Sequence, residues 1–77
     1  MKVPWDPTEF EGKATHKYPW NQMHDVGDYF DVPATHPAQQ RGVVQAASQQ
    51  YKNTGYKFAV LTIPNRAKRV ILIYIED

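Results

Sequence analysis

Residues 41–76 read RGVVQAASQQYKNTGYKFAVLTIPNRAKRVILIYIE, and this stretch holds most of the residues that are able to form a core. Its first part predicts a helix, because Val43, Ala47 and Tyr51 recur at every fourth position and define one helical face. The rest of the helix surface is expected to be polar, with Gln39, Gln40, Gln45, Ser48, Gln49 and Lys52. The apolar face is narrow and built largely from small residues, so the helix is expected to lie close against a sheet.

Both ends of this helix carry sequence signals. Thr35 is expected to cap the first turn, in which Pro37 is tolerated because that position has no intrahelical N–H partner. Gly55 is placed to end the helix in the left-handed conformation, which glycine adopts without strain.

A β-hairpin is predicted directly after the helix. Residues 56–63 are rich in aromatic and β-branched side chains, residues 64–67 supply a turn, and residues 68–76 return. Strict alternation places Tyr56, Phe58, Val60, Val70, Leu72 and Tyr74 on one face and Ala59, Leu61, Ile63, Ile71, Ile73 and Ile75 on the other. A strand that is apolar on both faces is typical of a sheet covered on both sides, and one helix covers only one side.

The residues before the helix complete a small α+β fold. Residues 18–23 predict one helical turn, with Trp20 and Met23 facing inward, and residues 29–33 predict a short strand. The order strand, helix, strand, strand predicts a three-stranded antiparallel sheet with one helix packed on it. We expect residues 18–77 to form this single domain.

Residues 1–17 lack periodicity and are interpreted as an extended arm ahead of the domain, with Trp5 and Phe10 among its apolar points. A chain of 77 residues buries only about 60% of its unfolded surface, and without cysteine it has no disulfide framework to add stability. Small domains of marginal stability are commonly stabilised by self-association, so a homodimer is expected. No apolar run approaches the length of a membrane span, and no membrane association is predicted.

Charge is distributed unevenly along the chain. Residues 1–40 hold three lysines and six acidic residues, which gives −3, whereas residues 41–77 hold six basic and two acidic residues, which gives +4. The sum is the net charge of +1. The predicted helix and hairpin therefore form a basic unit that follows an acidic half.

A group of residues spread over positions 18–70 resembles a set of small uncharacterised bacteriophage proteins. The residues that carry the resemblance are Tyr18-Pro19-Trp20, Met23, Val26-Gly27-Asp28, Phe30, Val32-Pro33, Arg41, Val43, Ala47, Tyr51, Gly55, Phe58 and Arg69-Val70. The resemblance implies a phage origin and a compact fold, but it implies no reaction. A location in the host cytoplasm is expected, and the absence of cysteine fits a reducing compartment. The chain departs from the group at residues 71–75, where ILIYI replaces a strand in which charged and apolar residues alternate.

No constellation in the sequence predicts catalysis or a cofactor. His16, His24 and His36 have Asp25 and Asp28 nearby in sequence, but their spacings match no standard metal-ligand motif. No glycine-rich phosphate loop is present, and no hydroxyl residue has an oriented histidine beside it in the predicted fold. We therefore expect no metal site, no catalytic residues and no cofactor.

Two binding functions remain as hypotheses. The first is the binding and modulation of a host protein through the second sheet face and the arm, with Trp5, Phe10, Leu61, Ile63, Ile71, Ile73 and Ile75 as interface residues. The alternative is DNA or RNA binding, in which glutamines of the helix reach base edges and basic residues contact phosphates. The basic residues expected in that role are Arg66, Lys68, Arg69, Lys57 and Arg41.

Overall fold

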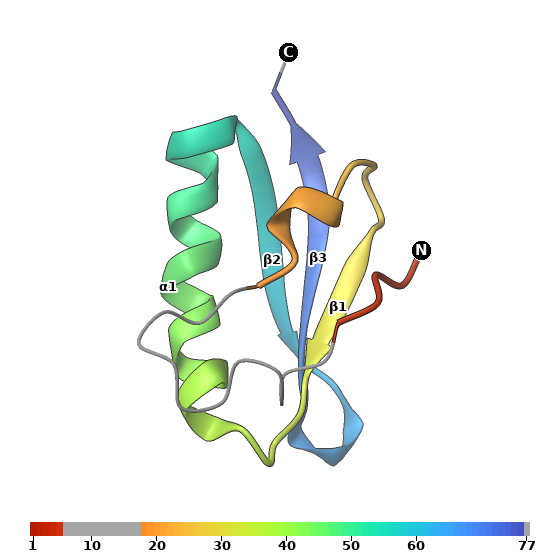
Figure 1. The fold of residues 1–77 in the computed structure, drawn as a ribbon, viewed down its shortest axis with the longest axis vertical. Helices are drawn as coiled ribbons and strands as arrows, with labels where there is room; N and C mark the ends of the chain where they lie inside the picture. Colours follow the sequence, from red (N-terminus) through yellow and green to blue (C-terminus); the bar gives the residue numbers. More distant parts are fainter. Residues whose placement is uncertain (6–17, 77) are drawn as a thin grey trace.

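The chain has a small α+β fold in the computed structural model, which describes residues 1–5 and 18–76 (Figure 1). The elements follow the order expected from the sequence. They are η2 (Trp20–Gln22), β1 (Tyr29–Val32), α1 (Pro37–Thr54), β2 (Tyr56–Thr62), η3 (Pro64–Arg66) and β3 (Lys68–Ile75).

The three strands form one antiparallel sheet in the order β1-β3-β2, which confirms the predicted architecture. The central strand β3 pairs with both neighbours, so Val70 lies opposite Phe30 of β1 and opposite Val60 of β2. These three side chains share one face of the sheet. Helix α1 packs mainly against β2 on that same side, which we call the inner face (Figure 1).

Helix α1 begins at Pro37 without a side-chain cap, so the prediction that Thr35 caps it was wrong. Because Pro37 is the first helical residue, the capping position falls on His36, which makes no side-chain capping hydrogen bond. A different side chain fixes this end of the helix. Gln40 Nε2 donates to the Val32 carbonyl at 2.9 Å and to the Arg66 carbonyl at 2.8 Å, which ties α1 to β1 and to the β2–β3 turn.

The other end of α1 follows its sequence signal. Gly55 adopts φ 76° and ψ 9°, the left-handed conformation, and its N–H donates to the Tyr51 carbonyl at 2.9 Å. A Cβ at this position would lie 3.3 Å from Glu76 Cβ, so both the dihedral angle and the space favour glycine.

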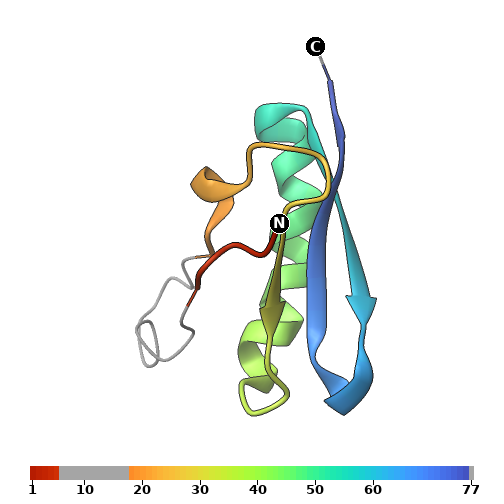
Figure 2. The ribbon, with the colours of Figure 1, turned by 90° about the vertical axis from the view of Figure 1, so that its right-hand side faces the viewer.

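The core lies between the inner face of the sheet and a layer made by α1, η2 and the first residues of the chain (Figure 2). Trp5 and Trp20 contact the ring of Phe30 with centroid distances of 5.2 and 5.5 Å, and both contacts are edge-on. The fully or nearly fully buried apolar residues are Val3, Met23, Phe30, Val32, Val43, Ala47, Val70 and Leu72.

Residues 1–5 belong to this folded unit, although the sequence suggested an arm ahead of it. Val3 is buried, and its N–H donates to the Tyr29 carbonyl at 2.7 Å. The Tyr29 N–H in turn donates to the Met1 carbonyl at 3.1 Å, so these first residues lie along β1. The remainder of the predicted arm, including Phe10, lies outside the described residues.

One glutamine of α1 is buried, contrary to the expectation of a polar helix surface. Gln39 is only 4% exposed, and its carbonyl accepts a hydrogen bond of 2.8 Å from the Tyr18 hydroxyl. The buried phenol thus receives an acceptor from the helix backbone. Burial also raises the pKa of Tyr18.

Asp28 fixes the turn that leads into β1. Its carboxylate accepts the N–H groups of His24 and Asp25 at 3.0 and 3.1 Å, and the N-terminal ammonium lies 3.5 Å away. The hydrogen bond from Asp25, followed by the one from His24 and by the ammonium, holds the pKa of Asp28 below its usual value. This single carboxylate therefore joins the turn after η2 to the first residue of the chain.

Candidate protein-binding face

The second face of the sheet, which we call the outer face, carries apolar side chains that no described residue covers. Leu61 of β2 is 50% exposed, and Ile73 and Tyr74 of β3 are 44% and 50% exposed. Ala59 and Ile71 lie between them and are half-buried. Helix α1, η2 and the first residues all lie on the opposite side of the sheet (Figure 2).

A β-bulge changes which residues belong to the outer face. The register of β2 and β3 shifts between Lys57 and Phe58, and Ile73 is the residue of β3 that has no partner in the ladder. Because one residue is inserted, the alternation reverses beyond it. Tyr74 is therefore exposed, and Ile75 packs against the core, so the strict alternation assumed from the sequence was wrong for this end of β3.

The other residues expected at a protein interface lie in different places. Trp5 packs in the core, 5.8 Å from the ring of Tyr18, and so does not cover the outer face. Ile63 follows β2 and is half-buried, and its N–H donates to the Ala67 carbonyl at 2.9 Å. The outer face therefore unites Leu61, Ile71 and Ile73 from the predicted set.

A polar cluster borders the outer face on β1. Arg69 Nε and one terminal nitrogen donate to the two carboxylate oxygens of Asp31 at 2.9 and 3.2 Å. The guanidinium carbon also lies 4.4 Å from the centre of the Tyr29 ring. The hydrogen bond to Asp31 raises the pKa of Arg69, and the planar guanidinium is held by both partners. Sequence reasoning missed Tyr29 and Asp31 here, because only the pairing of β1 with β3 brings them to Arg69.

The five basic residues considered for nucleic-acid binding do not form one surface. Arg69 is engaged by Asp31, and Lys68 Nζ donates to Thr62 Oγ1 at 2.6 Å. Arg66 is exposed at the β2–β3 turn, and Arg41 is exposed near the start of α1. Lys57 lies at the opposite end of β2. Two glutamines of α1 are not free to reach base edges, because Gln39 is buried and Gln40 bonds to the carbonyls of Val32 and Arg66.

Chemistry-bearing groups are sparse in the part of the chain that the structure describes. Among residues 1–5 and 18–76 no three histidine, aspartate or glutamate side chains gather to hold a metal ion. His24 is exposed and His36 precedes α1, while His16 lies outside these residues. Within the same residues no helix is long and apolar enough to cross a membrane.

Comparison of the chain with protein-family models, with curated proteins and with solved structures finds no match. Function is therefore inferred from the geometry of the chain itself.

Proposed function

We propose that this chain is a small non-enzymatic binding protein that contacts another protein through its outer face. The observation that carries the proposal is the exposure of Leu61, Ile73 and Tyr74 on one face of a sheet whose other face forms the core. Contiguous apolar surface on a domain of this size is typical of a contact site. The inner face packs with α1, η2 and the first residues to form the core, and the outer face takes no part in it.

The outer face has the composition of a protein interface. Its exposed residues are apolar and include Tyr74 near one end, and tyrosine is enriched among residues that dominate binding. Its border on β1 is the cluster of Tyr29, Asp31 and Arg69, in which the charges are already paired. Paired charges at a rim tolerate partial desolvation better than single charges, because each keeps its partner.

The partner in this proposal is a protein of the host cell, and binding modulates or inhibits it. This follows from the resemblance to small bacteriophage proteins and from the uncovered face together. A second copy of the chain is the other protein that the outer face could contact, and it is distinguished by mass in the experiment below.

Site-specific photo-crosslinking in bacterial cells tests the proposal. A photo-crosslinking amino acid replaces Leu61 or Ile73 on the outer face, and Asn53 or Gln45 on the exposed surface of α1 as matched controls. Adducts are expected from the two outer-face positions and not from the helix positions. Mass spectrometry then identifies the partner.

Equal adduct formation at the sheet and helix positions, or none at the sheet positions, contradicts the proposal. An adduct of twice the chain mass assigns the outer face to a second copy and removes the host protein from the proposal. Retention of the protein on DNA at low salt, with a steep loss as salt rises, supports the nucleic-acid alternative instead.

A further inference from the structure

The two edges of the sheet differ. On the β1 side, residues 1–3 lie along the strand, with hydrogen bonds from Val3 N–H to the Tyr29 carbonyl and from Tyr29 N–H to the Met1 carbonyl. On the other side, β2 has only β3 as a neighbour among the described residues. An edge strand without a partner presents a row of main-chain donors and acceptors.

The hydrogen-bond pattern identifies which groups of β2 point outward. Ile63 N–H donates to the Ala67 carbonyl, so this pair belongs to the hydrogen-bonded set that alternates along an antiparallel ladder. Leu61 and Ala59 therefore also bond to β3, and the main-chain groups of Phe58, Val60 and Thr62 point away from it. Among the described residues, no strand pairs with the six outward main-chain groups of these three residues.

The run has a defined start. The N–H of Tyr56, the next residue of the same parity, donates to Thr54 Oγ1 at 3.1 Å. This hydrogen bond satisfies the outward N–H of Tyr56 at the junction between α1 and β2, so it is not available to another strand. A strand that pairs with β2 is therefore expected to lie beside Phe58, Val60 and Thr62 and not to extend past Tyr56.

A groove of about 700 Å³ lies at the edge near the start of β2. Its lining comes from three elements: Ser48 and Tyr51 of α1, Lys57 and Phe58 of β2, and Ile73 and Tyr74 of β3. Val44 lies one helical turn before Ser48 and is 47% exposed, so an apolar flank of α1 continues beyond the groove. The edge of β2 thus has apolar side chains on both sides of it.

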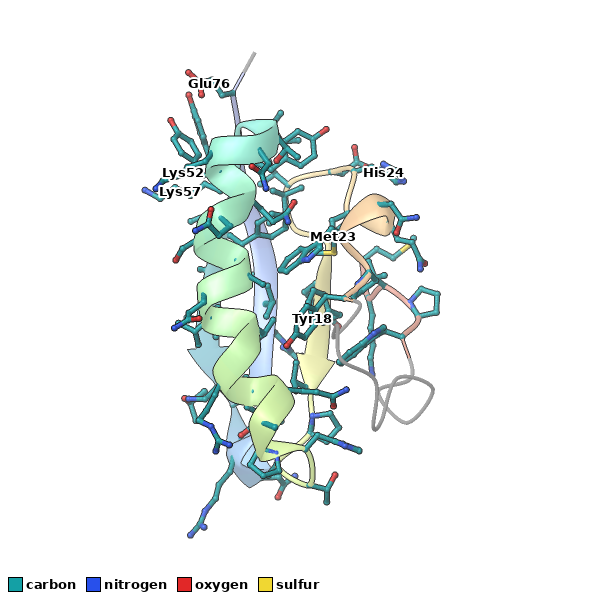
Figure 3. The ribbon with its side chains drawn as sticks, turned by 60° about the vertical axis from the view of Figure 1, so that its left-hand side comes forward. Tyr18, Met23, His24, Lys52, Lys57 and Glu76 are labelled. Carbon is teal, nitrogen blue, oxygen red and sulfur yellow. The ribbon has the colours of Figure 1, made fainter. Side chains whose placement is uncertain are left out.

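The described charged residues around this groove carry a net positive charge. Lys57 lines it, Lys52 follows Tyr51 on α1, and neither lysine has an ion-pair partner among the described residues. Figure 3 shows both lysines and Glu76 around the same end of α1. Glu76 acts on the Tyr51 hydroxyl by its charge and by a hydrogen bond, which raises the pKa of Tyr51. The two lysines and Glu76 sum to +1.

We propose that this groove binds an extended segment of the partner protein as a fourth strand beside β2. The segment is apolar at alternate positions, which face α1, and it carries a carboxylate that meets Lys57. This inference rests on the proposed function, because it names the form in which a protein partner engages. Addition of a strand to a free edge obtains affinity from main-chain hydrogen bonds and specificity from side-chain pockets.

A second copy of the chain fits this edge less well than an isolated segment. Two-fold pairing of β2 with its counterpart would bring a second helix to the same side of the sheet. Because α1 lies over β2 (Figure 1), both helices would then stand above two adjacent strands. Strands are about 4.8 Å apart, whereas packed helices need 8–10 Å between their axes.

Selection from a library of displayed random heptapeptides tests the inference. The peptides that are enriched on the folded chain are expected to contain Asp or Glu together with alternating β-branched residues. Each is then synthesised and titrated into the ¹⁵N-labelled protein. The amides of Phe58, Val60 and Thr62 are expected to shift and to gain protection from hydrogen exchange.

Two matched pairs of variants locate the binding. Thr62→Pro removes one outward N–H and no hydrogen bond to β3, and it is expected to weaken peptide binding about tenfold, whereas Thr62→Val leaves it unchanged. Lys57→Glu is expected to weaken binding about fivefold, and Arg66→Glu, the same charge change at the other end of the sheet, has little effect.

No enrichment from the library overturns the inference, and so do enriched peptides whose binding is insensitive to both Thr62→Pro and Lys57→Glu. Failure of the groove inference can be told apart from failure of the proposed outer-face function. Peptides that shift the Leu61 and Ile71 methyl signals but not the three edge amides refute the groove and support the outer face. Because Ile73 lines the groove as well as the outer face, the crosslinking result at Leu61 separates the two sites. Edge binding without an adduct at Leu61 refutes the outer face and keeps the groove.

Discussion

The inner and outer faces of the sheet are built from the same strands, and both carry large apolar side chains, but only those of the inner face are buried. In β3, Val70 and Leu72 are fully buried, whereas Ile73 is 44% exposed. The side chains alternate along one strand, so the difference does not come from strand propensity. It comes from the layer of α1, η2 and the first residues, which lies on one side only (Figure 2).

Within one strand, the inner-face residues therefore contribute to folding, and the outer-face residues are available for binding. A buried Leu or Val side chain stabilises the fold by about 1.5–3 kcal/mol relative to an exposed one. An exposed Ile or Tyr adds little to folding, and its burial energy remains available for a contact with another molecule. Substitutions on the two faces are therefore expected to affect different measurements.

The largest effect is expected for Leu72→Ala on the inner face. Removal of a fully buried side chain leaves a cavity, so the free energy of unfolding is expected to fall by about 3 kcal/mol. Ile71→Ala, the neighbouring residue on the outer face, is expected to cost about 1 kcal/mol or less. Urea unfolding followed by the fluorescence of Trp5 and Trp20 measures both. Equal losses would show that the outer face is also covered in solution.

A smaller effect is expected from acid, through Asp28 at the edge of the inner layer. The folded pKa of Asp28 is lowered, so its stabilising contribution is present above the unfolded pKa of about 3.9 and is lost as the pH falls through the folded pKa. At neutral pH the Asp28→Asn variant is expected to unfold at a lower temperature than the parent chain. The gap is expected to close below about pH 4 in thermal unfolding curves. A gap that stays constant from pH 7 to pH 3 rules out this role for the carboxylate.

The smallest effect on stability is expected for Leu61→Thr combined with Ile73→Thr on the outer face. Both side chains are about half exposed, and threonine suits a strand, so the free energy of unfolding is expected to change by about 0.5 kcal/mol or less. Binding of a hydrophobic fluorescent dye is expected to decrease, because apolar surface is removed. Loss of stability that depends on protein concentration would instead indicate that two copies bury this face.

The order of elements and the end of α1 could be predicted because their signals are local. The period of Val43 and Ala47 and the glycine at position 55 act within one or two turns of chain. The start of α1 at Pro37 also follows its local signal, but the expected Thr35 cap does not form. Gln40 instead fixes this end through the carbonyls of Val32 and Arg66, and the contact with Arg66 is remote in sequence. The burial of Gln39 likewise depends on Tyr18, 21 residues earlier.

In the candidate site, too, only the features that depend on local sequence could be predicted. An apolar second face could be inferred from residues 71–75 alone, but its membership could not. The bulge at Ile73 reverses the alternation, and no sequence signal marks it, so Tyr74 replaces Ile75 on the outer face. The roles of Arg69 and Trp5 were also set by partners from distant segments, Asp31 and Phe30.

The central position of β3 has a consequence for the order of events during synthesis. Both β1 and β2 pair with β3 and not with each other, so neither has a strand partner until residues 68–75 have left the ribosome. Until then α1 has no complete sheet to cover, and the apolar residues of both faces are exposed together. Of these three strands, the last to be made is therefore the one that joins the other two into a sheet.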